Sequence, residues 1–354
     1  MGVLSVGVYL PEVVRTNEWW PTDMVEAWER RVLTQVVRQD LQTEDPRSEC
    51  AQAMANAMAS VKGDPFQGAK RRHVMPEGMM SSDMELAAAE DALRKAGIQR
   101  SDVDVLLVSS ALPDNLNVSN ACVLHQRLGL PDRCLTTSID AMCNSFLMQL
   151  SLVEKLISAR LAKYAVLVQS AAMSRISRPE DQFSVWTGDG ATAVVVGPVS
   201  AGRGVLGRAH RTDGSVFGGI VTGVPGKNWW EGPPIVYIQD SRKARRMFLS
   251  IGDFCGPAMR EALDQASLTT DDISFYASHQ ATVWFQKVTQ RALGLDRAKN
   301  VSTFPDFGNM LGCNIPLNLH EGASRGLLRD GEVVAMMSGA AGMATSCAVL
   351  RWGV

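Results

Sequence analysis

Short apolar runs alternate along the chain with stretches in which apolar residues recur every three to four positions. The runs at 103–108, 164–168 and 191–196 are largely apolar, which is typical of buried β-strands. The stretches at 84–96 and 146–161 have the period of a helix. Strands that alternate with helices predict a layered α/β fold.

The chain also resembles itself. The helix-turn-strand unit that begins at 91–98 is matched by one that begins at 261–268, at an offset of 170. Matching units in the same order favour a chain of two similar halves, which we place at 1–200 and 201–354.

A second, shorter match supports this interpretation. Asp140 lies three residues before Cys143, and Asp306 lies three residues before Asn309, at an offset of 166. We therefore expect these two segments to be equivalent in the two halves.

Residues from about 19 to 68 have no counterpart in the repeat. Helix formers dominate there, and the apolar residues between Met24 and Val37 recur close to every 3.6 positions. This segment is predicted to be a helical insertion, either a cap over the core or a wall or lid of a substrate channel.

Composition narrows the class of protein. The 354 residues are 46% hydrophobic and carry a net charge of −2, which allows a large core and gives no nucleic-acid footprint. Seven cysteines without a CxxC pair indicate neither a disulfide framework nor structural zinc. The N-terminus has no basic n-region, and glycines, serines and threonines interrupt the uncharged window at 333–350, which predicts two buried strands. We expect a soluble cytoplasmic protein without membrane partners.

Two familiar motifs do not fit their usual contexts. The GxGxxG pattern at 202–207 is not followed by a helical pattern, as a phosphate-binding loop requires. The GxSxG pattern at 322–326 lacks the preceding strand of a nucleophile elbow. Neither predicts a site.

Three residues are better candidates for chemistry. Cys143 follows a predicted strand and opens an amphipathic run, where the start of a helix favours a thiolate. His279 ends a predicted strand, and Asn309 follows Gly308 just ahead of a helix. Taken singly, a core cysteine, a core histidine and a turn asparagine are the ordinary explanations.

Together, the motifs around these residues resemble those of a thiolase-superfamily condensing enzyme of the β-ketoacyl-(acyl-carrier-protein) synthase III type. The resemblance covers about residues 1–20 and 69–354, in the order found in the family. It rests on Arg71-Arg72, SSDM at 81–84, DAMC at 140–143, GDGA at 188–191, SHQA at 278–281, GN at 308–309, IPL at 315–317 and the segment 339–352.

The resemblance implies a duplicated thiolase fold with five layers, α-β-α-β-α, usually as a homodimer. It implies that Cys143 accepts an acyl group from a coenzyme A or carrier-protein thioester. His279 and Asn309 would stabilise the enolate of a second thioester, and the backbone N–H groups of Cys143 and of Ala341 or Gly342 would form the oxyanion hole. No metal or redox cofactor takes part in this chemistry.

A basic cluster is a candidate for binding the carrier. Arg242, Arg245 and Arg246, with Phe307, would meet the phosphates of coenzyme A or the acidic face of a carrier protein. A solvated helix face balanced by Asp240 explains the three arginines equally well.

The chain departs from the family pattern near the site. Asn144-Ser145 replaces a smaller pair after Cys143, Thr282 replaces the usual asparagine, and Ala340-Ala341 replaces glycines. Together with the insertion, these departures favour a specialised enzyme of polyketide or antibiotic biosynthesis over a housekeeping starter enzyme.

We therefore expect a ketosynthase that forms a carbon–carbon bond. Condensation of two acyl or β-ketoacyl chains is favoured. Decarboxylative condensation with a malonyl thioester is kept as an alternative. A third alternative is acyl transfer to an oxygen or nitrogen of a small molecule. A non-catalytic partner subunit is disfavoured, because Cys143, His279 and Asn309 are all present.

Overall fold

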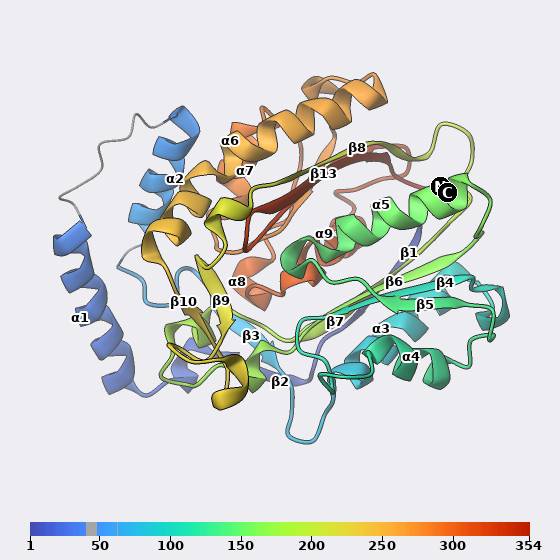
Figure 1. The fold of residues 1–354 in the computed structure, drawn as a ribbon. Helices are drawn as coiled ribbons and strands as arrows, with labels where there is room; N and C mark the ends of the chain where they lie inside the picture. The colour runs from blue at the N-terminus through green and yellow to red at the C-terminus, as the bar shows by residue number, and fades with distance from the viewer. Residues whose placement is uncertain (40–47, 62) are drawn as a thin grey trace.

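The computed structural model describes residues 1–39, 48–61 and 63–354, and two central sheets dominate this part of the chain (Figure 1). One sheet has the strand order β1-β7-β6-β4-β5, and the other has the order β11-β12-β13-β8. The strands of the first sheet are β1 (Gly2–Tyr9), β4 (Val105–Ser110), β5 (Leu135–Ser138), β6 (Ala165–Ala171) and β7 (Gly190–Gly197). Those of the second are β8 (Gly204–Thr212), β11 (Phe275–Ser278), β12 (Val333–Ala340) and β13 (Ala344–Arg351).

Helices pack on both outer faces and between the sheets (Figure 1). The first outer layer contains α3 (Ser81–Ala96) and α4 (Asn120–Leu128). The middle layer, between the sheets, contains α5 (Ser145–Ser158) and α9 (Asn314–Ser324). The second outer layer contains α6 (Ser241–Ala266) and α7 (Phe285–Ala292). This is the predicted five-layer α-β-α-β-α order.

The central strands are apolar because they are covered on both faces. Every residue of β6 and β7 is buried, so neither strand shows the alternation of a half-exposed strand. Phe146 and Leu150 of α5 pack with Val334 of β12 between the sheets. Burying each such side chain contributes about 1.5–3 kcal/mol, so the middle layer holds the two halves together.

The predicted repeat at an offset of 170 is confirmed. Helix α3 ends at Ala96 and α6 at Ala266, and the strands that follow begin at Val105 and Phe275. All strands of the first sheet lie within 1–200, and all strands of the second lie within 201–354.

The shorter match is wrong in register. The 3₁₀ turn Met142–Asn144 leads into α5 as the turn Leu311–Cys313 leads into α9, at an offset of 169. Asp306 lies in α8 (Phe304–Phe307), so Asp140 corresponds instead to Asn309. A shared residue type at one position misled the alignment, because the equivalence lies in the backbone.

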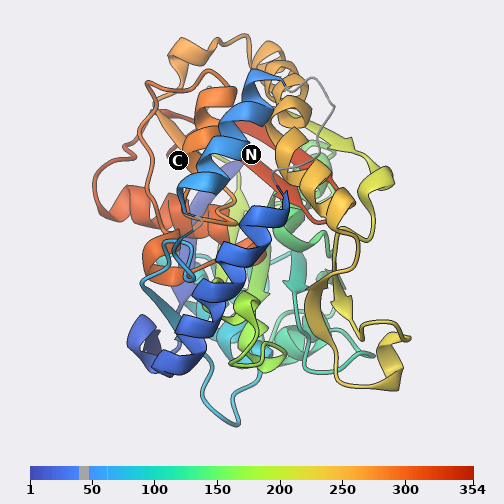
Figure 2. The same cartoon turned by 90° about the vertical axis from the view of Figure 1, so that its left-hand side faces the viewer.

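The insertion is helical, as predicted, in α1 (Thr22–Gln39) and α2 (Glu49–Ser60); residues 40–47 of it lie outside the described residues. Both helices lie across one side of the molecule (Figure 2). Met54 of α2 is fully buried in the cluster that contains residues of α6 and α7. The insertion is therefore a cap over the core.

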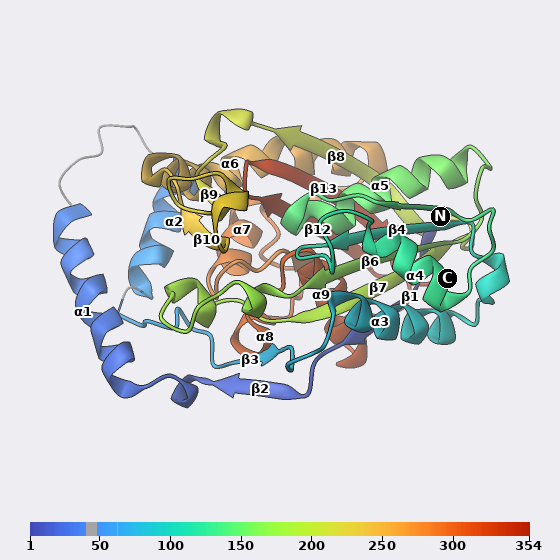
Figure 3. The same ribbon diagram turned by 60° about the horizontal axis from the view of Figure 1, so that its bottom comes forward.

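A two-stranded ribbon, β9 (Ile220–Gly223) and β10 (Ile235–Ile238), lies beside the beginning of α6 (Figure 3). A second ribbon pairs β2 (Val13–Thr16) with β3 (Arg71–Val74). The window at 333–350 forms the hairpin of β12 and β13, as predicted. Among the described residues, no helix combines the length and apolarity needed to cross a membrane.

Candidate active site

Cys143 lies in the 3₁₀ turn that precedes α5. Met142 has φ of +52°, which is rare for a residue with a side chain. The Asp140 carboxylate accepts the N–H of Met142 at 3.0 Å, and the Ser145 hydroxyl accepts the N–H of Ala141 at 2.9 Å. The strained turn is thus held on both sides of Met142.

The expectation of a resting thiolate at Cys143 is wrong. Burial raises the pKa of the Cys143 thiol to about 12, and the Asp140 carboxylate adds to the rise. The side chain's own backbone N–H opposes this effect without overcoming it. The resting nucleophile is therefore a neutral thiol, which loses its proton only as it reacts.

His279 directly follows β11 and is buried. Its Nδ1 lies 2.9 Å from Nδ2 of Asn314. An amide N–H can only donate, so Nδ1 accepts and the neutral ring carries its proton on Nε2. Burial lowers the pKa of His279 to about 4, which keeps the ring neutral near pH 7.

Asn309 is oriented by hydrogen bonds to its side-chain oxygen. Oδ1 accepts the N–H of Leu311 at 2.9 Å and Nδ2 of Asn314 at 3.0 Å. Gly308 has φ of +68°, and a Cβ there would lie 2.8 Å from the carbonyl oxygen of Trp186, so the turn needs glycine. With its oxygen engaged, Asn309 is left with Nδ2 as a donor for the cavity that it lines.

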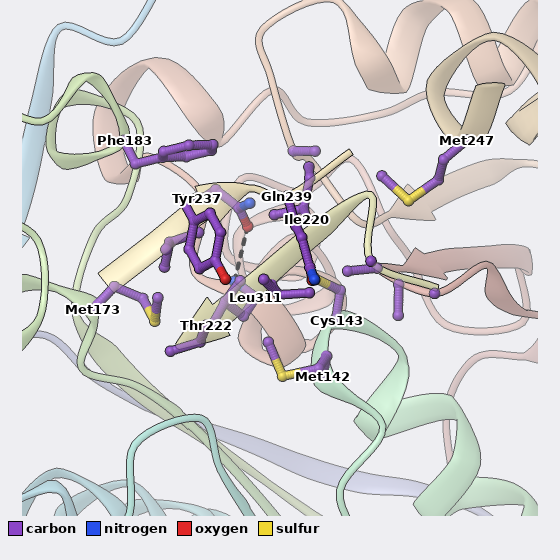
Figure 4. Close-up of a pocket in the computed structure, with 18 of the residues that line it drawn as sticks. Met142, Cys143, Met173, Phe183, Ile220, Thr222, Tyr237, Gln239, Met247 and Leu311 are labelled. Atoms are coloured by element: carbon purple, nitrogen blue, oxygen red, sulfur yellow. Dashed lines mark hydrogen bonds between the residues drawn. The ribbon is translucent and has the colours of Figure 1, made fainter. Parts of the chain in front are cut away.

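These residues meet at one cavity of about 710 Å³ (Figure 4). Cys143, His279 and Asn309 all line it, and so do residues 339–342, at the end of β12 and in the turn that leads to β13. The predicted nucleophile, its two partners and the predicted oxyanion loop are thus brought together from both halves of the chain.

Sequence reasoning missed the rest of the cavity wall. Figure 4 shows Ile220, Thr222 and Tyr237 of the β9–β10 ribbon at the cavity with Cys143. Further apolar residues come from α6 and from three loops: Phe183, Trp186, Phe217, Trp229, Met247, Phe248 and Ile251. The adjacent pair Trp229-Trp230 in a glycine- and proline-containing segment was the available signal for an exposed functional loop.

The insertion supports this wall from behind. The indole N–H of Trp20 donates to the carbonyl oxygen of Pro179 at 3.1 Å, and that of Trp28 donates to Glu180 at 3.2 Å. The loop that they hold continues to Phe183 and Trp186, which line the cavity.

The predicted carrier-binding residues are not at the cavity itself. The ring of Phe307 stacks on His73 at a centroid distance of 5.9 Å, and Phe307 is not among the described residues that line the cavity. Arg242, Arg245 and Arg246 lie in the first turns of α6, a few residues before Met247. They are therefore close in sequence to a residue that lines the cavity, but they do not line it themselves.

Arg246 lies 3.5 Å from the Asp213 carboxylate. Asp240 accepts the N–H groups of Arg242 and Lys243 as the N-cap of α6. The cluster is thus partly neutralised by its own surroundings.

No group of three or more His, Cys, Asp or Glu side chains in the described part of the chain is arranged to hold a metal ion.

Comparison with known proteins identifies the class. Residues 138–214 match the family model of 3-oxoacyl-(acyl-carrier-protein) synthase III, and residues 263–352 match its C-terminal model. The β-ketoacyl-(acyl-carrier-protein) synthase III of Geobacillus kaustophilus is 31% identical over 287 residues, which cover 81% of this chain and 88% of the relative.

Solved structures agree. The β-ketoacyl-(acyl-carrier-protein) synthase III of Thermus thermophilus has a TM-score of 0.78 and 27% identity, covering 100% of this chain and 99% of that one. OleA of Xanthomonas campestris has a TM-score of 0.80 at 17% identity, covering 99% and 98%, and shares the fold.

The chain therefore belongs to the β-ketoacyl-(acyl-carrier-protein) synthase III family, with the thiolase fold predicted from its motifs. It is an acyltransferase of the ketosynthase type, which condenses acyl thioesters.

Proposed function

We propose that Cys143 accepts an acyl chain from a thioester and that the bound chain is then joined to a second thioester by Claisen condensation. The observation that carries this proposal is the cavity where a thiol, two hydrogen-bond donors and a backbone loop converge. Acyl transfer to an oxygen or nitrogen would leave the paired donors His279 and Asn309 without a role.

In the first step, the sulfur of Cys143 attacks the thioester carbonyl. The backbone N–H groups of Cys143 and of Ala341 or Gly342 stabilise the oxyanion of the tetrahedral intermediate. The carbon–sulfur bond to the donor breaks, and the departing thiol takes up the proton that Cys143 loses. Thioester exchange suits a polarizable sulfur nucleophile.

In the second step, Nε2–H of His279 and Nδ2–H of Asn309 stabilise the enolate oxygen of the second thioester. The enolate carbon attacks the acyl carbonyl on Cys143 and forms the new carbon–carbon bond. The carbon–sulfur bond to Cys143 then breaks, and the sulfur takes up a proton again. Both donors are neutral, so neither must be desolvated as a charge.

A malonyl-type second thioester has the stronger support. No carboxylate lies among the described residues that line the cavity, and Nδ1 of His279 is occupied by Asn314. Loss of carbon dioxide generates an enolate without a base, whereas joining two unactivated chains requires one. The geometry thus shifts our preference from two-chain to decarboxylative condensation.

Two-chain condensation is the second candidate, because the cavity is large and its wall is mainly apolar. About 710 Å³ lies in the upper part of the range for small-molecule sites. A β-ketoacyl chain is also acidic at the carbon between its carbonyls, which lowers the demand on a base.

We propose that the acyl preference of this enzyme differs from that of other family members. The β9–β10 ribbon and the start of α6 lie in residues 215–262, between the two regions that match the family models. The same segment supplies much of the cavity wall. Because this part of the wall lies outside both family models, we propose that it adapts the enzyme to an acyl substrate of polyketide or antibiotic biosynthesis.

The partners follow from the substrate. The donor is a coenzyme A or carrier-protein thioester, and the start of α6 with Arg242 and Arg245 is its proposed docking region.

Strand β5 is an edge of the first sheet and exposes Leu135, which supports a homodimer. All seven cysteines are free, which suits the cytoplasm.

Intact-protein mass spectrometry with a panel of acyl thioesters tests the proposal. Wild type is expected to gain the acyl mass, and Cys143→Ala is expected to gain none. Malonyl-carrier protein or a β-ketoacyl thioester, added next, should discharge the adduct and release a carbon-extended product. An adduct discharged only by an alcohol or amine would overturn condensation, and no adduct with any thioester would overturn the function.

A further inference from the structure

Three polar side chains form a row across the second sheet. Ser338 of β12 pairs directly with Ser346 of β13, and Ser346 pairs directly with His210 of β8. Directly paired residues on neighbouring strands project from the same face of a sheet. Both serines are fully buried.

Two members of this row bind the nucleophile turn. The Ser338 hydroxyl donates to the carbonyl oxygen of Cys143 at 2.7 Å. Nδ2 of Asn144 donates to the Ser346 hydroxyl at 2.8 Å. The N–H of Asn144 in turn donates to the carbonyl oxygen of Ala141 at 3.0 Å. The peptide group that follows Cys143 is therefore held at both its carbonyl and its N–H.

The third member orients Ser346. Nδ1 of His210 lies 2.7 Å from the Ser346 oxygen. Because that oxygen already accepts from Asn144, its single hydrogen is available for Nδ1 of the neutral imidazole. His210 thus offers the hydroxyl a stronger acceptor than the thioether sulfur of Met148, which lies 3.7 Å from the same oxygen.

The same two strands carry the other half of the proposed oxyanion hole. Strands β12 and β13 are joined through Ala341, Gly342 and Met343, the segment expected to supply the second N–H donor. A hydrogen bond from Ser338 therefore connects the backbone of Cys143 to the hairpin whose tip must share a substrate oxygen with it.

We propose that Ser338, Ser346 and Asn144 are positioning residues, which align the N–H of Cys143 with the Ala341–Gly342 loop so that both donors reach one oxyanion. His210 supports them by orienting Ser346. This inference rests on the proposed role of Cys143 as the acyl acceptor. Asn144 is a position at which the chain departs from its family, so the resemblance does not imply this arrangement.

Two reactions of the Cys143 thiol distinguish a loss of alignment in the oxyanion hole from a general disturbance of the site. Acylation by 4-nitrophenyl hexanoate passes through a tetrahedral oxyanion, whereas alkylation by iodoacetamide does not. For Ser338→Ala, Ser346→Ala and Asn144→Ala, the acylation burst should slow about 10- to 100-fold, as for a displaced catalytic group. Alkylation of Cys143 should stay within about twofold, because neither its burial nor its proton is altered.

Matched variants complete the test. Thr345→Val removes a buried hydroxyl from the same strand, but its side chain projects from the opposite face, so acylation should be unchanged. Ser346→Thr keeps the hydroxyl and should recover most of the rate. Equal losses in acylation and alkylation, or no loss in either, would overturn the inference.

The ester probe carries neither coenzyme A nor a carrier, so it tests this inference independently of the donor. If no thioester acylates wild type but the ester still does, the proposed function fails and the positioning role is still measured. If thioesters acylate wild type and the alanine variants keep their full ester burst, only the positioning role fails.

Discussion

Nδ2 of Asn314 lies 2.9 Å from Nδ1 of His279. The orientation of the Asn314 amide is fixed, because its Oδ1 accepts the N–H of Met310 at 3.1 Å. One buried asparagine thus determines which nitrogen of His279 carries the proton, and its bond to Asn309 orients the second donor as well.

Asn314→Asp is expected to impair condensation selectively. A carboxylate at this position accepts a hydrogen bond from Nδ1–H, which favours the tautomer in which Nε2 of His279 has no hydrogen. Loss of one oxyanion donor should slow condensation about 10²- to 10³-fold, with acylation of Cys143 much less affected. Single-turnover measurements of the two steps check this, and an equal slowing of both would contradict the assigned proton position.

His279 should make the native state sensitive to acid. Burial lowers its pKa from 6.5 to about 4, so between these values the unfolded chain binds a proton that the folded chain does not. Stability therefore falls as pH decreases through this window. From pH 7 to pH 5 the loss from this one group is about 2 kcal/mol.

Denaturant unfolding of wild type and His279→Asn at both pH values isolates that contribution, since the other titrating groups are common to the two proteins. Wild type should lose about 2 kcal/mol more than the variant. Equal losses would show that His279 is accessible to protons in the folded protein.

Within the cap, Trp20 should contribute to the stability of the fold, and its neighbour Trp19 should contribute little. Trp20 is buried, with its N–H bonded to Pro179, whereas Trp19 is 44% exposed. Trp20→Ala should cost about 3–5 kcal/mol, and Trp19→Ala should cost less than about 1 kcal/mol. The free energy of unfolding from denaturant titration checks the pair; similar costs would mean that the cap is not packed as described.

The β9–β10 ribbon should limit the length of the acyl chain. Ile220 lines the cavity, so Ile220→Trp should lower kcat/KM for the longest accepted acyl thioester at least about tenfold and spare short ones. Ile238→Trp changes an exposed residue of the same ribbon and serves as the control. A uniform loss across all chain lengths in Ile220→Trp would refute a role in selecting length.

The sequence predicted the layers and the central site residues well for identifiable reasons. Strands β6 and β7 are buried on both faces, so their apolar runs are unmistakable. Cys143, His279 and Asn309 each follow or precede a regular element within a recognisable motif, so their convergence at one end of the layers could be expected.

Other features depend on packing that a single sequence does not encode locally. The neutral thiol of Cys143 results from burial by elements of both halves, which outweighs the favourable start of α5. The ribbon strands are four residues long and only partly buried, so they lack a clear period. The equivalence of Asp140 and Asn309 is visible only in the bonds that each makes to the residue two positions later.

That equivalence has a steric consequence. Met142 and Leu311 have nearly the same positive φ, and the residues that follow them are Cys143 and Gly312. A Cβ on Gly312 would lie 3.2 Å from the carbonyl oxygen of Met142, so the two turns leave little room for a second side chain. A second cysteine in place of Gly312 would therefore press its side chain against the turn that carries Cys143. The contact between the two turns thus favours a side chain on only one of them, so one turn carries the nucleophile and the other, with Gly312, gives it space.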